Sequence, residues 1–343
     1  NLKIIGCFKM SVKKLAFSGV QPTGNLHLGN YLGALTNFVS LQKEMECIFC
    51  VVDLHAITTF QKPEELRQNI FETTAAFLAI GLDEKKNIIF NQSSVSGHAE
   101  LAWILNCVSR IGWLNRMTQF KDKAGSDKEK ASVGLYIYPN LMAADILLYK
   151  ATHVPVGADQ KQHLELCRDI AQKFNNDFKS ENFFPVPEPL IQKNISRVMS
   201  LRDGTKKMSK SEESNYSRID LKDSADEIVK KIKKAKTDSL PIPGQEKELE
   251  KRPEALNLLK IYADLKKTPM QKILSEMEGK EFSLLKDKLS DCLVATICPV
   301  GKKIKELIDD KRYLEQVLNK GREKALKKAE ENLKKIREIV GLL

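Results

Sequence analysis

Two short segments, far apart in the chain, carry residue types suited to binding a polyphosphate. The first is SGVQPTGNLHLGN, residues 18–30, where Gly19, Gly24 and Gly29 let the backbone approach a ligand closely. It follows an apolar run and precedes a helical pattern, so the N–H groups at the start of that helix would point at an anion in the turn. It matches neither GxxxxGK[ST] nor GxGxxG. A turn of purely structural role, with His27 as a packed side chain, is the alternative.

The second segment is KMSKS, residues 207–211, which sets two lysines three positions apart in a glycine-containing loop. Lys207 and Lys210 offer the positive charge that the first segment lacks. A further candidate for a functional residue, separate from the two phosphate-binding segments, is the isolated carboxylate of Asp145 in MAAD. An aspartate in an apolar helix is either a cap or salt-bridge partner, or a buried acceptor for a ligand N–H.

Composition describes a globular chain and favours a polyanionic partner. The 343 residues are 42% hydrophobic and 29% charged, which allows one large domain or two ordinary ones. No apolar run is long enough to span a membrane. The net charge of +11 favours an anionic partner. The 7 cysteines are odd in number and unpatterned, which indicates reduced thiols in a cytosol-like compartment, and Cys47 and Cys50 are predicted to be core residues.

The elements that must position these residues follow an α/β pattern. A helix is predicted between Pro63 and Gly81, because proline suits its first turn and glycine its end. The helix after the first turn should bury Leu32, Leu35, Val39 and Leu41. Predicted strands are Leu15–Val20, Ile48–Val52, Ile88–Asn91, His153–Val156 and Arg197–Leu201. Strands alternating with helices predict a parallel sheet, in which ligands collect at the carboxyl ends of the strands.

The character of the chain changes after about Leu201. Residues 203–215 have no apolar periodicity and are predicted to form a basic surface loop. Beyond them Ser224 and Glu227 form a capping box, and helical patterns continue to the end. The last of these places Leu326, Ala329, Leu333, Ile336 and Val340 on one face.

The turn and the KMSKS segment together resemble the signature of class I aminoacyl-tRNA synthetases. Their HxGH element usually ends in histidine, where Asn30 stands here. The asparagine form, together with VDLHAIT, YPNLMAADILLY and VPVGADQKQHLEL, is similar to tryptophanyl-tRNA synthetases of the bacterial and organellar type. The likeness is firm from about residue 14 to about residue 212 and looser beyond. At Ala158 the family commonly has glutamate, so only the backbone of that position is expected to act.

The resemblance implies a Rossmann-like parallel-sheet catalytic domain at residues 13–215, an α-helical tRNA anticodon-binding domain at 216–343, and an amino-terminal extension at 1–12. It implies that Lys123, Lys207 and Lys210 are catalytic. The implied ATP-binding residues are Gln21, Pro22, Thr23, Gly29, Asn30, Gly157, Ala158, Asp159, Val198, Lys207, Met208, Ser209, Lys210 and Ser211. The implied tryptophan-binding residues are Asp145 as the acceptor of the indole N–H, with Phe17, His55, Tyr138, Met142, Val154, Val156 and Gln160.

By the same resemblance, the chain would join L-tryptophan to tRNA(Trp) through tryptophanyl-adenylate. Mg²⁺ would travel with ATP and no metal would be held by the protein. A homodimer without membrane attachment is expected in the cytoplasm, an organellar matrix being the alternative. The rival hypotheses are a tyrosine-specific synthetase, a small-molecule adenylyltransferase and an inactive RNA-binding relative.

Overall fold

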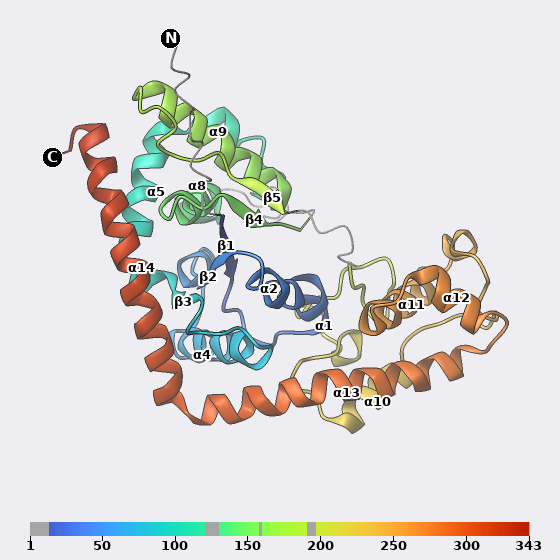
Figure 1. The fold of residues 1–343 in the computed structure, drawn as a ribbon. Helices are drawn as coiled ribbons and strands as arrows, with labels where there is room; N and C mark the ends of the chain where they lie inside the picture. The colour runs from blue at the N-terminus through green and yellow to red at the C-terminus, as the bar shows by residue number, and fades with distance from the viewer. Residues whose placement is uncertain (1–13, 121–129, 158–159, 191–196, 343) are drawn as a thin grey trace, which may run out of the picture.

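A parallel sheet forms the centre of the molecule. The computed structural model describes residues 14–120, 130–157, 160–190 and 197–342. Five strands lie in the order β3-β2-β1-β4-β5 (Figure 1). They are β1 (Leu15–Val20), β2 (Glu46–Val51), β3 (Ile88–Asn91), β4 (His153–Pro155) and β5 (Glu188–Leu190). In register, Phe17 pairs with Ile48, Ile48 with Ile88, and Ala16 with His153. Because every pairing is parallel, the carboxyl ends of the strands lie at one edge of the sheet.

The first four predicted strands are confirmed, with small shifts at the ends of the second and fourth. The fifth prediction is wrong. Residues 197–201 form only an isolated bridge, between Met199 and Lys207, and the fifth strand is β5 instead. This strand escapes the hydrophobic pattern because it is three residues long and contains Pro189. Proline is acceptable there because β5 pairs on one side only, with β4.

Helices cover both faces of the sheet (Figure 1). Those between the strands are α1 (Leu28–Asn30), the π-helix η1 (Tyr31–Leu35), α2 (Thr36–Leu41), α3 (Asp53–Ala56), α4 (Pro63–Ala79), η2 (Gln92–Ser94), α5 (Gly97–Val108), α6 (Ile111–Leu114), α8 (Val133–Leu147) and α9 (Lys161–Asp177). Those after the sheet are η5 (Asn215–Ser217), α10 (Ala225–Lys233), η6 (Glu246–Leu249), α11 (Pro253–Lys266), α12 (Met270–Met277), α13 (Phe282–Asp309) and α14 (Lys311–Val340). The predictions for α4, with Pro63 in its first turn, and for the Ser224–Glu227 capping box of α10 are confirmed.

Alternation along the strands divides the core into two layers. Ala16 and Phe49 face the layer shared with α2, α4 and the helices after residue 220, whereas Phe17 and Ile48 face α5, α8 and α9. Cys47 and Cys50 are buried and unpaired, as predicted for core thiols. In the described part of the chain, no helix has the length and apolar content needed to cross a membrane.

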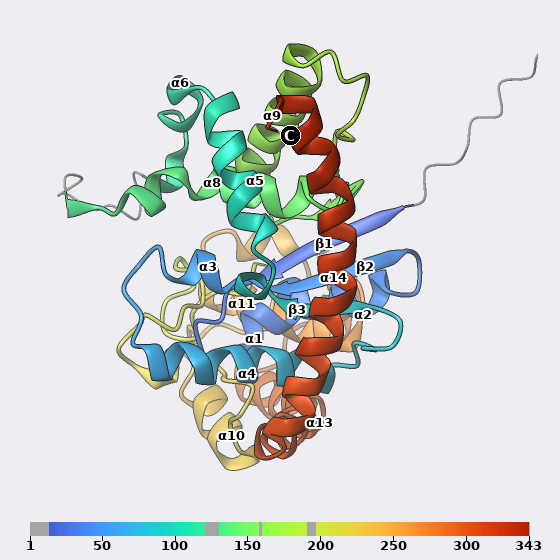
Figure 2. The same ribbon diagram turned by 90° about the vertical axis from the view of Figure 1, so that its left-hand side faces the viewer.

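The last helix, α14, joins the two layers. Figure 1 shows α13 running beneath the sheet and α14 turning up along it, and Figure 2 shows α14 passing beside β3. A Cβ atom at Gly321 would lie 1.7 Å from the carbonyl oxygen of Ile89, so glycine lets the helix backbone rest on this edge strand. Of the predicted face, Ala329, Leu333 and Ile336 are buried here, whereas Leu326 and Val340 are half-buried. The domain limits predicted above stay a prediction.

Candidate active site

The carboxyl edge of the sheet collects polar residues from four strands. Residues 21–30 follow β1, Asp53 and His55 follow β2, Gln92 follows β3, and Gly157 follows β4. The strand order places a topological switch between β1 and β4, where open α/β sheets bind their ligands. The turn at residues 21–30, His55 and Gly157, predicted from the sequence as site residues or their neighbours, therefore lie at this edge, and their roles stay a prediction.

The turn after β1 is shaped by a reciprocal cap. His27 is the N-cap of α1, and its Nδ1 accepts a hydrogen bond from the N–H of Gly29 at 3.1 Å. Oδ1 of Asn30 accepts one from the N–H of His27, also at 3.1 Å. A Cβ atom at position 29 would lie 3.0 Å from the His27 ring, so glycine belongs there. Asn30, which stands where the general class I signature usually ends in histidine, thus completes the cap.

The helix that follows the turn is not continuous. A π-helical stretch, η1, separates α1 from α2, and such stretches occur often at functional sites. The predicted inward face is therefore only partly right. Leu35 and Leu41 are buried, but Leu32 and Val39 are half-buried, and Phe38 is buried instead.

His27 is neutral near pH 7. Its pKa is lowered to about 4, mainly by burial; the charge of Asp220 acts to raise it, and those of Arg218, Lys207 and Lys210 act to lower it. A neutral ring can accept the Gly29 N–H through Nδ1, as the cap requires.

The KMSKS segment contacts this turn. The Nζ of Lys210 donates a hydrogen bond to the carbonyl oxygen of Thr23. Met208 is buried, and its N–H donates to the carbonyl of Val198 at 3.0 Å. The prediction of a surface loop therefore fails at Met208, which anchors the segment in the core. Burial lowers the pKa of Lys210, since its ammonium group is partly removed from water.

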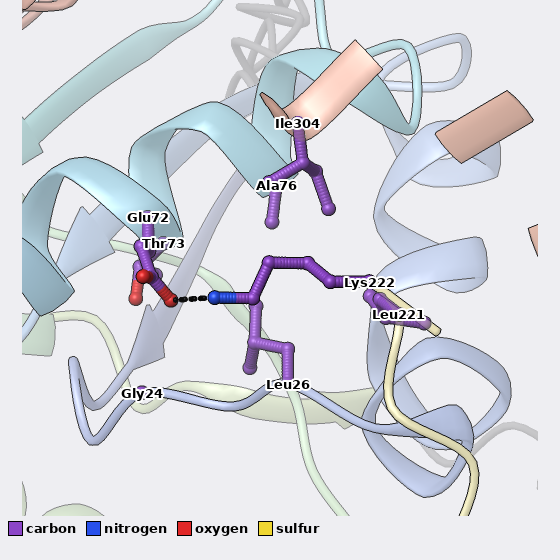
Figure 3. Close-up of a pocket in the computed structure, with 8 residues that line it drawn as sticks. All are labelled: Gly24, Leu26, Glu72, Thr73, Ala76, Leu221, Lys222 and Ile304. Atoms are coloured by element: carbon purple, nitrogen blue, oxygen red, sulfur yellow. Dashed lines mark hydrogen bonds and ion pairs between the residues drawn. The ribbon is translucent and has the colours of Figure 1, made fainter. Parts of the chain in front are cut away.

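The chain after the KMSKS segment pairs with the turn itself. The N–H of Leu28 donates to the carbonyl of Ile219, and that of Leu221 to the carbonyl of Leu26, both at 2.8 Å. The next residue, Lys222, makes a 2.9 Å ion pair with Glu72 of α4 beside a cavity of about 10 Å³ (Figure 3). This cavity is too small for a ligand, so the segment serves to hold the turn against α4.

Arg218 fastens the KMSKS segment to its surroundings. Its guanidinium group donates to the carbonyl of Glu212 at 3.1 Å, to Asn215 Oδ1 at 2.7 Å and to Asp220 Oδ1 at 3.1 Å. Glu212 in turn accepts from the hydroxyl of Ser200 at 2.9 Å. Arg218 is a buried residue, so these bonds fix the end of the segment beside the turn.

The buried carboxylate of Asp145 forms the other half of the site. Its Oδ2 accepts from Nε2 of His55 at 2.7 Å, and its Oδ1 accepts from Nε2 of Gln92 at 2.6 Å and from Nδ1 of His98 at 2.7 Å. Burial acts to raise the pKa of Asp145, but the interactions with His55 and His98 outweigh it and hold the pKa below its usual value. The group is therefore an ionised acceptor inside an apolar layer.

Other predicted tryptophan-site residues belong to the hydrophobic layer that contains α8, the helix of Asp145. Phe17, Val154 and Val156 are buried in the same hydrophobic cluster, and Met142 packs against it. The rings of His55 and Tyr138 meet edge to face with centroids 6.0 Å apart. The hydroxyl of Tyr138 donates to Gln119 Oε1 at 2.6 Å and lies 2.9 Å from Nε2 of His163.

Three other predicted residues make local contacts. The N–H of Gln160 donates to the carbonyl of Gly157 at 3.0 Å, at the start of α9. Ser209 and Ser211 make a local turn contact with each other. Lys123, Ala158 and Asp159 lie outside the described residues. In the ranges described, no group of three or more His, Cys, Asp or Glu side chains is placed to hold a metal ion.

The comparisons with known proteins agree with this geometry. Residues 12–295 match the family model of tRNA synthetases class I (W and Y). The chain belongs to this family. It is 56% identical to the tryptophan–tRNA ligase of Brucella melitensis biotype 1, over 96% of this chain and 98% of that one. The resemblance inferred from the motifs is confirmed.

Solved structures support the same assignment. Tryptophanyl-tRNA synthetase from Mycoplasma pneumoniae superimposes with a TM-score of 0.86 at 34% identity, over 96% of this chain and 98% of that one. The Campylobacter jejuni tryptophanyl-tRNA synthetase, in complex with ADP and tryptophan, gives 0.78 at 34% identity, over 95% and 99%. The expected fold class, a Rossmann-like sheet with a helical carboxyl-terminal region, is confirmed.

Proposed function

We propose that this chain activates L-tryptophan with ATP, forming tryptophanyl-adenylate and pyrophosphate, and then transfers the tryptophanyl group to tRNA(Trp). The contact between Lys210 and the Thr23 carbonyl carries the proposal. It joins the KMSKS lysines to the turn after β1, on the sheet edge that also holds His55 and Gln92, the partners of Asp145.

In this reaction the carboxylate of tryptophan attacks the α-phosphorus of ATP and pyrophosphate leaves. The chain contributes position and charge, because no protein nucleophile is required. The turn at residues 21–30 cradles the nucleoside, and Lys207 and Lys210 neutralise the departing pyrophosphate. Charge that engages mainly as the bond breaks stabilises the transition state more than the ground state. Mg²⁺ bound to the phosphates of ATP supplies further neutralisation.

On the amino-acid side, Asp145 accepts the indole N–H. A buried acceptor that is left without a donor is costly, so an amino acid lacking the N–H is rejected. Phe17, Val154 and Val156 line the pocket for the apolar ring, and Tyr138 lies toward the polar end of the amino acid.

A homodimer fits the surface of the molecule. Five large apolar side chains are exposed on neighbouring elements. The exposed fraction is 88% for Phe60 and 70% for Trp103, and the other three residues of this patch are Ile57, Ile111 and Val133. They come from α5, α6, the start of α8 and the loop after α3, which Figure 2 shows on one side of the molecule. The hydroxyl of Ser132 donates to the carbonyl of Thr58 at 2.8 Å, which joins two of these elements. Light scattering of Phe60→Glu, compared with wild type, tests this dimer.

The helices after residue 220 would contact tRNA through phosphates and bases. A reducing compartment such as the cytoplasm suits the free thiols of Cys47, Cys50 and Cys167.

Amino-acid-dependent ATP–pyrophosphate exchange tests the function directly. Exchange that requires tryptophan supports the proposal, and exchange with tyrosine alone overturns it. Asp145→Ala should abolish the preference for tryptophan, and circular dichroism checks that the variant folds. Charging of tRNA(Trp) transcripts then tests the second step.

A further inference from the structure

Asp145 has one accepting position left. Its Oδ1 already receives two hydrogen bonds, from Gln92 and His98, and its Oδ2 receives one, from His55. A carboxylate offers about four acceptor sites in total. The open position is therefore on Oδ2. The other three hydrogen bonds orient the carboxylate and so set the direction in which this position points.

The amide of Gln92 cannot turn around. Its Oε1 accepts the backbone N–H of Leu54 at 3.1 Å, so its NH₂ group must point toward Asp145. Gln92 is fully buried, and water cannot replace either bond. The backbone after β2 thus dictates that Gln92 acts as a donor.

The ring of His98 is fixed in the same manner. Its Nε2 lies 2.8 Å from the hydroxyl of Tyr149, and burial raises the pKa of Tyr149 far above its ordinary value. Tyr149 therefore keeps its proton, and the contact of its hydroxyl with Nε2 holds the ring so that Nδ1 faces Asp145 and donates to Oδ1. The Tyr149 ring is held in turn by stacking on Phe17 at 5.9 Å and by an edge contact with Phe90 at 6.0 Å.

We propose that Gln92, His98 and Tyr149 are positioning residues that set amino-acid specificity by orienting the carboxylate of Asp145. This inference rests on the proposed role of Asp145 as acceptor of the indole N–H. Because Gln92 and His98 each donate to the carboxylate, Asp145 offers the ligand a single remaining acceptor position. An indole N–H donates once and accepts nothing, so it matches this arrangement. A phenol oxygen also needs a donor, and a ring without N–H leaves the last position of a buried anion unpaired.

The test compares L-tryptophan with β-(3-benzothienyl)-L-alanine, in which sulfur replaces the indole N–H at nearly the same size. The measured quantity is the ratio of kcat/KM for the two substrates in ATP–pyrophosphate exchange. Because both substrates are measured on one preparation, the ratio does not depend on the fraction of enzyme that is folded. The variants are Gln92→Met, His98→Leu, His98→Asn and Tyr149→Phe. Tyr136→Phe, which loses a partly exposed hydroxyl bonded to Asn115, is the control.

Gln92→Met, His98→Leu and Tyr149→Phe should each lower the ratio about tenfold or more, mainly through a higher KM for tryptophan, since hydrogen bonds to charged groups have about this effect. His98→Asn keeps a donor near the position of Nδ1, so its ratio should lie closer to wild type than that of His98→Leu. Tyr136→Phe should leave the ratio unchanged. A purely structural role would slow both substrates alike.

The experiment distinguishes failure of this inference from failure of the proposed role of Asp145. An unchanged ratio in Gln92→Met and Tyr149→Phe overturns the inference while tryptophan activation by the wild type stands. A wild-type protein that does not exchange with tryptophan, or that uses both substrates equally well, removes the role of Asp145 on which the inference rests.

Discussion

Replacing Lys210 by alanine should slow adenylate formation far more than it weakens ATP binding. In the structure the ammonium group bonds a neutral backbone carbonyl, that of Thr23, and burial lowers its pKa. During the reaction it would exchange this bond for the departing pyrophosphate. At about 4 Å and an effective dielectric constant of about 20, a pair of unit charges gains about 4 kcal/mol. Losing the carbonyl bond costs about 1 kcal/mol.

The difference, about 3 kcal/mol, corresponds to a rate lower by about 150-fold. Single-turnover quenched-flow measurement of tryptophanyl-adenylate at saturating ATP gives this rate, and its dependence on ATP concentration gives the affinity. The control is Lys206→Ala, which removes an exposed lysine paired with Asp203 in the same loop and should change neither quantity by much. An unchanged rate in Lys210→Ala, or a loss confined to ATP affinity, would refute the role given to this lysine.

Three further predictions concern the scaffold of the site. Gly321→Ala should lower the free energy of unfolding by about 1–3 kcal/mol, because the new methyl group meets Ile89, whereas Gly112→Ala, with open space around it, should not; urea titration compares them. His27 binds a proton near pH 6.5 when unfolded and near pH 4 when folded, so the folded state loses stability as pH falls through this window. Between pH 7 and pH 4.5 the free energy of unfolding should therefore fall by up to about 3 kcal/mol less in His27→Asn than in wild type, as urea titrations at the two pH values can measure. Arg218→Lys cannot make all three bonds of the guanidinium, so it should raise the KM for ATP several-fold while the KM for tryptophan stays unchanged.

The elements that could be predicted are those with a local signal. β1 and β3 are apolar runs bounded by turns, and α4 begins with Pro63. β5 could not be found, because Glu188–Leu190 is held by pairing with β4 rather than by its own composition. The residues from Tyr31 to Leu35 also contain no sequence signal for a π-helix. This π-helix shifts the buried face of the helix that follows.

The same contrast holds within the site. Lys207, Lys210 and Asp145 could be proposed from the sequence, because their motifs are contiguous in it; their roles stay a prediction. Gln92 and His98 were missed, since their partner Asp145 lies 53 and 47 positions away and only the fold brings them together. A weak signal was present. Gln92 follows a buried strand directly, and His98 begins a helix that is otherwise largely apolar.

The two halves of the site differ in how their charges are held, and this difference has a mechanistic consequence. Asp145 is buried with three donors from α3, η2 and α5, so moving it would leave several buried groups unpaired. Lys210 is partly exposed and bonds one neutral carbonyl, so it can change partner without stranding a buried charge. In the proposed mechanism, recognition of the amino acid would therefore depend on a rigid acceptor, whereas bond breaking would depend on a cation whose contact is easily exchanged. A rigid acceptor can select the ring in the ground state, while an exchangeable cation can act later, as the bond to pyrophosphate breaks. Charge committed to the phosphates in the ground state would add binding without lowering the barrier.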